Sequence, residues 1–320
     1  MIPIYALSEK CYYEWMKDHI VRAIDARQTS QWARYMESIG WKTETIGSTH
    51  LFIKKLPFID ASLMKIQHPQ GPFPFERIDE ISRKYKTIWT ILEPHMLGYE
   101  ESEFRKYGYR KSRMLQVHTA TIKIDLKKSK KDMFNSFSEN AKRNIKKAQK
   151  QNLEIRTIFM KEKKNWKYFP VFYSLLRNLS KMKKFYIYSY YEYQKRMMAF
   201  KDTSVLIFAY ENDAPIAVVW YAYFSNVIAY FQTGITKRGY ETLANYLLVW
   251  EGLKLGKKLK LSVFDFESIY DERFPKNVPQ YKKYTEFKKR FHGELILYPT
   301  PWIKIYNLWA KLFYLWGTIL

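Results

Sequence analysis

The residues able to carry out nucleophilic, redox or metal chemistry are few, and their spacing excludes several enzyme classes. The six histidines show no metal-ligand spacing, and Cys11 is the one cysteine among 320 residues. The chain contains no Gly-x-Ser-x-Gly turn, no Gly-Lys-Ser/Thr phosphate loop and no dinucleotide-binding glycine pattern. Metal catalysis, nucleotide hydrolysis and serine-hydrolase chemistry therefore have no support in the sequence. We expect neither a metal site nor a bound cofactor.

The charged residues are mostly basic and are unevenly distributed. Lys and Arg number 55 against 31 Asp and Glu, which gives a net charge of +24 at pH 7. The stretch from Lys123 to Lys184 holds 19 basic and five acidic residues, so it alone carries +14. A protein this basic is expected to meet an anionic partner such as nucleic acid, a diphosphate-bearing metabolite or an acidic lipid surface.

Residues 138–152 lie inside this stretch and predict a helix with one thin apolar stripe, formed by Ala141, Ile145 and Ala148. Basic side chains cover the rest of the helix and have almost no acidic neighbour four residues away. The helix is therefore either a solvated surface or an anion-binding one. The basic side chains are Lys142, Arg143, Lys146, Lys147 and Lys150.

The sequence also bears on the compartment. Its first residues lack a basic start followed by an apolar run, so we predict no signal peptide. No stretch approaches the roughly 18 uncharged apolar residues that a membrane-spanning helix requires. A lone cysteine suits a reducing environment. These features predict a cytoplasmic protein.

Predicted helices and strands alternate along the chain, which indicates an α/β fold in two domains. The first domain covers residues 1–120, and the second covers 121–301. In the second domain we expect a hairpin over 204–224, a strand over 226–234, a helix over 241–255 that ends at Gly256, and a strand over 260–266.

The last residues, 302–320, place Trp302, Tyr306, Trp309, Phe313 and further apolar residues at steps of three and four. This spacing predicts a helix with a narrow polar stripe. Such a helix either packs back on the first domain or lies in a membrane interface.

Residues 226–266 resemble the core of the GNAT acyltransferases, in which a strand leads through a loop to a helix and then to another strand. Acyl-CoA-dependent members hold the donor's diphosphate on a loop with closely spaced glycines. Here the loop has Gly239 followed by Tyr240 and Glu241, and a second glycine is missing. The expected fold is GNAT-like, but the acyl donor is expected to differ from acyl-CoA.

Over nearly its whole length the chain resembles the Fem A/B/X peptidyltransferases. The resemblance depends on the order and spacing of short segments, each weak alone. They are Gln28-Thr-Ser-Gln-Trp32, Gly40-Trp41, Gln70-Gly71-Pro72, Glu93-Pro94, Ile122-Lys-Ile-Asp-Leu126, the basic helix, Phe264-Asp-Phe-Glu-Ser-Ile269 and Phe287-Lys-Lys-Arg-Phe-His-Gly293.

The resemblance implies two GNAT-like domains, each a mixed sheet flanked by helices, without the coiled-coil arm of some members. It implies transfer of an amino acid from aminoacyl-tRNA to the stem-peptide amine of a peptidoglycan precursor, which builds the interpeptide bridge. The donor substrate is then the tRNA, which the five basic residues of the 138–152 helix would bind. The expected protein is a monomer, and contact with the inner membrane face is an open option.

The resemblance also implies site residues. Lys288 and Phe287 match the family's Phe-Lys pair, so Lys288 would support the oxyanion or the tRNA end. The alternative for Lys288 is a surface lysine in a basic stretch. Phe287 would wall the site, stack on the terminal base or belong to the core. Glu93 matches an acidic site residue of the family. It would either orient or deprotonate the acceptor amine, or cap the following turn.

For the acceptor, Arg34 is the candidate to hold a diphosphate, since a guanidinium suits phosphate. Tyr193 aligns with a substrate-binding tyrosine, although Ser189 stands where the family has an arginine. Two rival functions remain: an acyl-CoA-dependent N-acyltransferase on the same fold, and a non-catalytic RNA- or membrane-binding protein. The sequence leaves open which amino acid is transferred and whether the acceptor is nucleotide-linked or lipid-linked.

Overall fold

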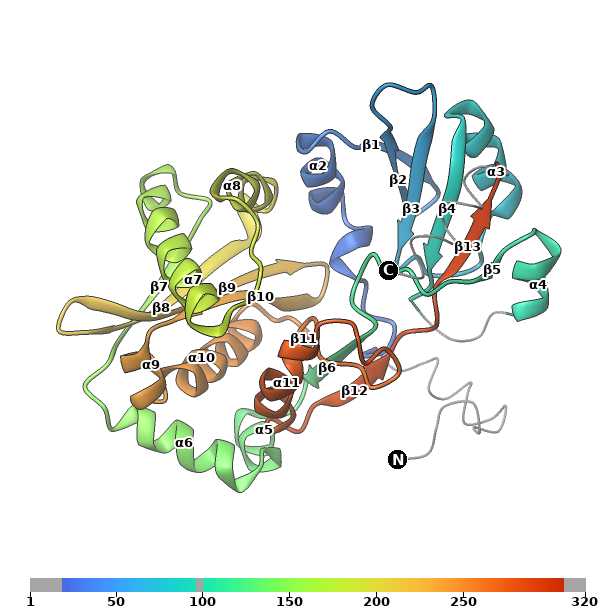
Figure 1. The fold of residues 1–320 in the computed structure, drawn as a ribbon. Coiled ribbons are helices and arrows are strands. Elements are labelled where there is room, and N and C mark those ends of the chain that lie inside the picture. The colour runs from blue at the N-terminus through green and yellow to red at the C-terminus, as the bar shows by residue number, and fades with distance from the viewer. Residues whose placement is uncertain (1–18, 96–99, 308–320) are drawn as a thin grey trace. The chain divides into compact units, whose positions relative to one another are not determined.

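The computed structural model describes residues 19–95 and 100–307, and these residues form two compact units (Figure 1). Of the described residues, unit 1 comprises 19–23 and 120–296, and unit 2 comprises 24–95, 100–119 and 297–307. Each unit contains one mixed β-sheet with helices packed against it, as expected for an α/β fold. No helix of the described residues is long and apolar enough to cross a membrane.

Unit 2 is built on a six-stranded sheet with the order β1-β2-β3-β4-β13-β5, in which β3 and β4 run parallel. Its strands are β1 (Lys42–Ile46), β2 (Thr49–Lys55), β3 (Ser62–Gln67), β4 (Thr87–Glu93), β5 (Arg110–Lys111) and β13 (Trp302–Ile305). Its helices are η2 (Ala26–Gln28), α2 (Ser30–Ser38), α3 (Phe75–Lys84) and α4 (Glu101–Lys106).

The core of unit 2 follows from strand alternation. Leu51 and Ile53 of β2 face the cluster under α3 and α4, while Phe52 between them points to the other face. Phe75 and Phe104 hold the two helices in this cluster, with their ring centroids 5.0 Å apart. The sheet therefore carries apolar side chains on both faces.

Unit 1 is built on a seven-stranded sheet with the order β12-β6-β11-β10-β9-β8-β7. The strands are β6 (Ala120–Asp125), β7 (Glu154–Phe159), β8 (Ser204–Glu211), β9 (Ala214–Phe224), β10 (Val227–Ile235), β11 (Val263–Asp265) and β12 (Glu294–Leu297). The helices are α5 (Lys130–Ser136), α6 (Glu139–Gln149), η3 (Lys163–Tyr168), α7 (Phe169–Lys183), α8 (Tyr190–Ala199), η4 (Lys201–Thr203), α9 (Lys237–Glu241), α10 (Ala244–Lys258), η5 (Pro279–Tyr281) and α11 (Lys282–Lys289).

Helices cover both faces of the unit 1 sheet. Helices α7 and α8 lie on one face, whereas α10 covers the other and α6 packs on α10 (Figure 1). The predicted basic helix is confirmed as α6, with Ser138 as its N-cap and with Ala141, Ile145 and Ala148 fully buried. The predicted hairpin is confirmed as β8 and β9.

Two predictions at element ends are wrong. Gly256 does not end a helix, because α10 continues to Lys258. A Cβ at Gly256 would come within 2.8 Å of Leu126 and Ile228, so this glycine serves close packing rather than termination. The predicted helix over 302–320 begins instead as strand β13, because Trp302 and Ile303 are both buried between β4 and β5. Residues 308–320 of that prediction lie outside the described residues.

Candidate functional site

Lys288 is one of two almost completely buried lysines among the described residues of unit 1: 2% of its surface is exposed, against 1% for Lys123 on β6. Lys288 lies on the inner side of α11. Its Nζ donates hydrogen bonds to the carbonyl oxygens of Phe266 at 2.6 Å and Ser268 at 2.7 Å. The same nitrogen lies 4.3 Å from the ring centroid of Tyr284. The interpretation of Lys288 as a surface lysine is therefore wrong.

The two carbonyls are available to Lys288 because strands β10 and β11 separate early. Their parallel pairing covers three residue pairs, which end at Ala229 and Asp265. Beyond this point the N–H of Phe266 donates to the carbonyl of Ile122 on β6. Strand β10 itself has a bulge between Tyr230 and Gln232. The chain that leaves β11 thus follows β6, and two carbonyl oxygens of this segment accept hydrogen bonds from Lys288.

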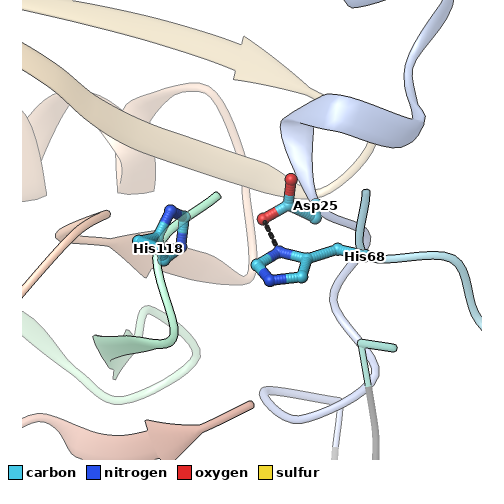
Figure 2. A group of neighbouring side chains, drawn as sticks. All are labelled: Asp25, His68 and His118. Atoms are coloured by element: carbon cyan, nitrogen blue, oxygen red, sulfur yellow. Dashed lines mark hydrogen bonds and ion pairs between the residues drawn. The ribbon is translucent and has the colours of Figure 1, made fainter. Parts of the chain in front are cut away.

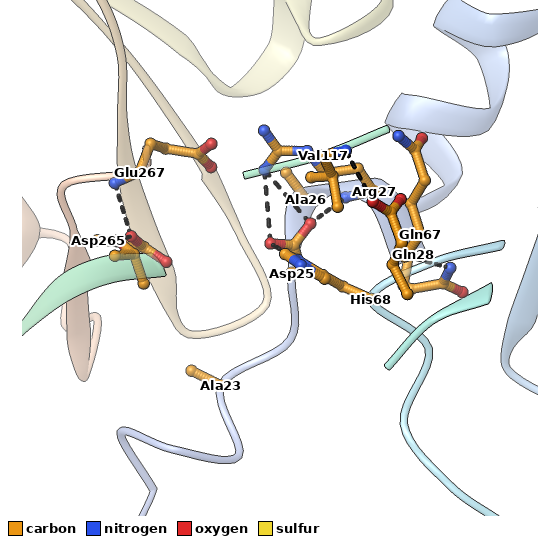
Figure 3. A network of polar contacts seen from close by, with 12 residues as sticks. Ala23, Asp25, Ala26, Arg27, Gln28, Gln67, His68, Val117, Asp265 and Glu267 are labelled. Atoms are coloured by element: carbon orange, nitrogen blue, oxygen red, sulfur yellow. Dashed lines mark hydrogen bonds and ion pairs between the residues drawn. The ribbon is translucent and has the colours of Figure 1, made fainter. Parts of the chain in front are cut away.

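A turn in the Phe264–Ile269 segment fixes this arrangement. The Oδ1 atom of Asp265 accepts a hydrogen bond from the N–H of Glu267 at 2.7 Å (Figure 3) and another from the hydroxyl of Thr121. Glu267 has a φ of 59°, in the left-handed region that non-glycine residues seldom adopt. The aspartate therefore stabilises the turn that supplies the carbonyls of Phe266 and Ser268. The turn is thus a structural reason for the sequence of the Phe264–Ile269 segment.

Burial governs the charge of Lys288. Loss of hydration lowers the pKa of its ammonium from 10.5 to about 7, against the opposing charges of Glu267 and Asp265. The side chain therefore changes charge near neutral pH. In its ammonium form the side chain has three N–H bonds, of which the two carbonyls take two, so the third can donate to a developing negative charge.

Phe287 is half-buried and lies among aromatic rings of unit 1. Its ring centroid is 4.9 Å from that of Tyr246 on α10 and 5.5 Å from that of Phe291, and it stacks on Tyr284 at 6.1 Å. Its partial exposure distinguishes it from Phe291, which is fully buried. Phe287 thus shares Tyr284 with Lys288 while keeping one side accessible.

The five basic residues predicted to bind tRNA lie together. They line a groove of about 500 Å³ along α6, which is also lined by Phe134 and Asn135 of α5 and by Glu139 at the start of α6. Lys142 pairs with Glu139 at 2.5 Å, and Lys146 lies 6.0 Å from the ring centroid of Phe134. One acidic residue faces five cations, so the groove is strongly positive and open to an anion.

The two predicted acceptor-binding residues occupy different environments. Tyr193 on α8 is buried in unit 1, where its ring packs against Phe172 of α7 and against Tyr188. Burial raises the pKa of its hydroxyl above the ordinary value. Arg34 lies on α2 of unit 2 and is exposed. Their role in substrate binding stays a prediction.

Glu93 is a buried carboxyl group at the end of β4 in unit 2. Its Oε1 accepts hydrogen bonds from the N–H groups of Gln116 at 2.6 Å and Val117 at 3.1 Å. Its Oε2 is buried without a hydrogen-bond partner among the described residues. Burial raises the pKa of Glu93 to about 8, although Lys65 and Arg27 oppose the shift. Glu93 therefore ties down a distant segment rather than the turn that follows it.

Sequence reasoning missed a buried cluster in unit 2 (Figure 2). The Nδ1 of His68 lies 2.9 Å from the Oδ2 of Asp25, and the ring of His68 has its centroid 5.2 Å from that of His118. His68 also stacks on Tyr298 at 3.9 Å. Because these residues are more than 40 positions apart, no sequence spacing could reveal the cluster.

Asp25, His68 and His118 have the chemistry of a metal site, since their ligand atoms lie within 4.8 Å of one another. However, Arg27 already supplies a cation. Its backbone N–H donates to the Oδ1 of Asp25 at 2.8 Å, and its guanidinium lies 3.3 Å from the same atom (Figure 3). Burial raises the pKa of Asp25, but the charges of Arg27 and His68 outweigh this and hold the pKa well below its ordinary value. The aspartate is therefore charged and balanced without a metal.

The loop compared above with an acyl-CoA cradle is the short helix α9. The hydroxyl of Thr236 accepts the N–H of Gly239 at 3.1 Å, so one of the amides available to a diphosphate is used within the chain. Arg238 pairs with Glu211 at 2.7 Å and with Glu241 at 3.4 Å. A Cβ at Gly239 would come within 2.5 Å of the carbonyl of Ile216, which explains the glycine by packing.

Comparisons with known proteins place this fold. No family model matches the chain, and a search of curated proteins found no match. Among solved structures, FemX is similar with a TM-score of 0.76 at 12% identity, over 96% of this chain and 98% of that one. The C-terminal domain of a putative lysylphosphatidylglycerol synthetase from Agrobacterium fabrum has a TM-score of 0.59 at 8% identity, over 94% and 93% of the chains.

A third similar structure is L-PGS from Bacillus licheniformis, with a TM-score of 0.53 at 10% identity, over 87% of this chain and 88% of that one. These likenesses confirm the fold that the Fem resemblance implied, over nearly the full length of the chain. They do not identify the substrates.

Proposed function

We propose that this protein is a tRNA-dependent aminoacyltransferase that attaches an amino acid to the stem-peptide amine of a peptidoglycan precursor. The observation that carries the proposal is the environment of Lys288, a buried lysine on a fold shared with FemX over 96% of the chain. The ordered sequence segments that resemble the Fem family support the same function. The similarity to FemX, to the putative synthetase domain and to L-PGS supports the fold alone, so the proposed chemistry rests on the chain's own residues.

In the proposed reaction the acceptor amine attacks the ester carbonyl of the aminoacyl-tRNA. A C–N bond forms, the C–O bond to the tRNA ribose breaks, and the proton lost by the amine ends on the ribose hydroxyl. The barrier lies largely in the negative charge that develops on the carbonyl oxygen. In its ammonium form, Lys288 would stabilise this oxyanion with the N–H that Phe266 and Ser268 do not use.

Glu93 is the proposed residue for the acceptor amine. An ammonium group must lose a proton before it can attack, and a base is most effective when its pKa approaches that of its partner. Burial raises the pKa of Glu93 to about 8, which brings it closer to the pKa of an ammonium group. Its Oε2, buried without a hydrogen bond among the described residues, is the atom that would accept the proton.

The groove along α6 is the proposed surface for the tRNA backbone. Its five cations face a single acidic side chain. Binding there would release counterions from the polyanion, so the affinity should fall steeply with salt. The acceptor carries either a nucleotide or a lipid, and Arg34 and Tyr193 are the residues proposed to bind it.

Transfer of a radiolabelled amino acid from charged tRNA tests the proposal directly. Three acceptors should be offered in parallel: a nucleotide-linked muropeptide, a lipid-linked muropeptide and phosphatidylglycerol vesicles. The last acceptor is included because one of the similar structures is named as a domain of a putative lysylphosphatidylglycerol synthetase. Transfer to either muropeptide supports the proposal. Transfer only to the phospholipid, or transfer from acetyl-CoA but from no aminoacyl-tRNA, would overturn it.

A further inference from the structure

A cluster of exposed apolar and basic side chains lies where α7 leads into α8. The described residues of the whole chain expose eight large apolar side chains, and five of them lie between residues 182 and 198. Tyr186 is 81% exposed and Tyr191 is 72% exposed. We call this surface the tyrosine patch. It consists of Met182, Tyr186, Tyr188, Tyr191 and Met198, together with Lys181, Lys183, Lys184 and Lys195.

The backbone of the patch is held in place by α7. The hydroxyl of Tyr173 donates to the carbonyl of Tyr188 at 3.1 Å, and the N–H of Phe185 donates to the carbonyl of Ser180 at 3.2 Å. On α8, Tyr191, Lys195 and Met198 follow one another at steps of four and three, so they share one face of the helix. The rings are therefore presented at the surface by an ordered scaffold.

The charge around the patch is mostly positive. Residues 181–198 contain four lysines and Arg196 against one acidic residue, Glu192. Helices α7 and α8 lie on the opposite face of the unit 1 sheet from α10 and α6 (Figure 1). The tyrosine patch is thus a second basic surface, separate from the α6 groove, and it differs from that groove by its exposed apolar side chains.

We propose that the tyrosine patch binds the surface of an anionic lipid bilayer. Tyrosine rings are favoured at membrane interfaces, where the ring enters the apolar layer and the hydroxyl stays hydrated. Lysines beside them attract acidic headgroups. Transfer of a methionine side chain into an apolar layer is favourable, but this side chain offers no flat surface on which a nucleobase could stack.

Ring geometry favours a bilayer over single-stranded RNA. Tyr186 and Tyr188 meet at an interplanar angle of 83°, and Tyr190 and Tyr191 meet at 86°. Stacking of successive bases needs ring faces that lie roughly parallel and accessible. Edge-to-face rings provide no such platform, whereas an apolar layer accepts rings in any orientation.

Co-sedimentation of the full chain with lipid vesicles tests the surface and requires no catalysis. The native protein should bind vesicles containing about 30% phosphatidylglycerol and should bind phosphatidylcholine vesicles far less. The Tyr186→Ser/Tyr191→Ser variant should lose about tenfold in partitioning, and Lys183→Gln/Lys184→Gln should lose about as much. The charge-matched control, Lys127→Gln/Lys128→Gln, removes two exposed lysines from another loop and should lose less than about twofold.

Circular dichroism of each variant verifies that it is folded. The proposal fails if the native protein binds no anionic vesicle, or if both tyrosine substitutions leave binding unchanged. A third measurement uses a labelled single-stranded RNA oligonucleotide. If the tyrosine variant loses RNA binding but keeps vesicle binding, the patch is a nucleic-acid surface and the proposal is overturned.

Discussion

Lys288 in unit 1 and Glu93 in unit 2 are both buried ionisable groups. Burial lowers the pKa of Lys288 and raises the pKa of Glu93, so it favours the neutral form of each. They differ in how their polar atoms are satisfied. In its charged form Lys288 gives two of its three N–H bonds to carbonyls, so the third remains as a donor. In its charged form Glu93 receives two N–H bonds on one oxygen, so the other oxygen remains as an acceptor. Lys288 is therefore suited to stabilising a developing anion, and Glu93 is suited to accepting a proton.

The largest expected effect comes from removing the donor. The Lys288→Met variant should lower kcat at least about hundredfold, because loss of one oxyanion donor costs roughly this much. Transfer assays under saturating substrates measure it. Lys289→Met is the matched control, since Lys289 is the adjacent exposed lysine of α11 and pairs only with Glu286 among the described residues. Equal losses in both variants would remove Lys288 from the chemistry.

The next effect comes from removing the acceptor. Glu93→Gln keeps the size of the side chain and an oxygen for the two N–H groups, but it cannot take a proton. We expect kcat to fall by about 10²-fold at pH 7.5, within the range for general base catalysis. Glu103→Gln on α4 is the exposed control. An unchanged rate would limit Glu93 to holding the segment at residues 116 and 117.

Exposed lysines should behave differently from the buried one. The triple substitution Lys146→Gln/Lys147→Gln/Lys150→Gln in the α6 groove should raise KM for the tRNA about tenfold or more at low salt and leave kcat nearly unchanged. The salt dependence of KM should become less steep, because fewer counterions are released. Lys161→Gln/Lys163→Gln serves as the control elsewhere on unit 1. A fall in kcat without a change in KM would contradict a binding role for α6.

The smallest effects concern stability, and they have opposite signs in the two units. The folded state binds fewer protons than the unfolded state at Lys288 between about pH 7 and 10.5, so this group's stabilising contribution grows as pH rises and is lost as pH falls through about 7. At Glu93 the folded state binds more protons between about 4.5 and 8, so its contribution is present in acid and lost as pH rises through about 8.

Chemical unfolding of the native protein and of the Lys288→Met and Glu93→Gln variants measures these contributions. Relative to Lys288→Met, the free energy of unfolding of the native protein should rise with pH between about 7.5 and 9.5, by at most about 1.4 kcal/mol per pH unit. Relative to Glu93→Gln, it should fall between about 5 and 7.5. Parallel curves in either comparison would mean that burial does not shift the pKa of that group.

Much of the fold could be predicted because local patterns and tertiary packing agree. The spacing of Ala141, Ile145 and Ala148 predicted α6, and packing on α10 buries these residues. Prediction failed where a local pattern had two solutions. Trp302 begins an apolar spacing typical of a helix, but only the neighbouring strands β4 and β5 decide that residues 302–305 form a strand. Gly256 likewise looked like a helix end until its packing against Leu126 and Ile228 was known.

The sequence by itself determined the excess of positive charge, the α/β alternation and the ordered segments that resemble the Fem family. It could not determine the environment of any one side chain. Lys288 is one of several lysines in a basic stretch, and only the separation of β11 from β10 buries it against two carbonyls. The cluster of Asp25, His68 and His118 likewise has no trace in sequence spacing. The reason is physical: a pKa depends on desolvation and on neighbours brought together by folding, and these are properties of the tertiary structure.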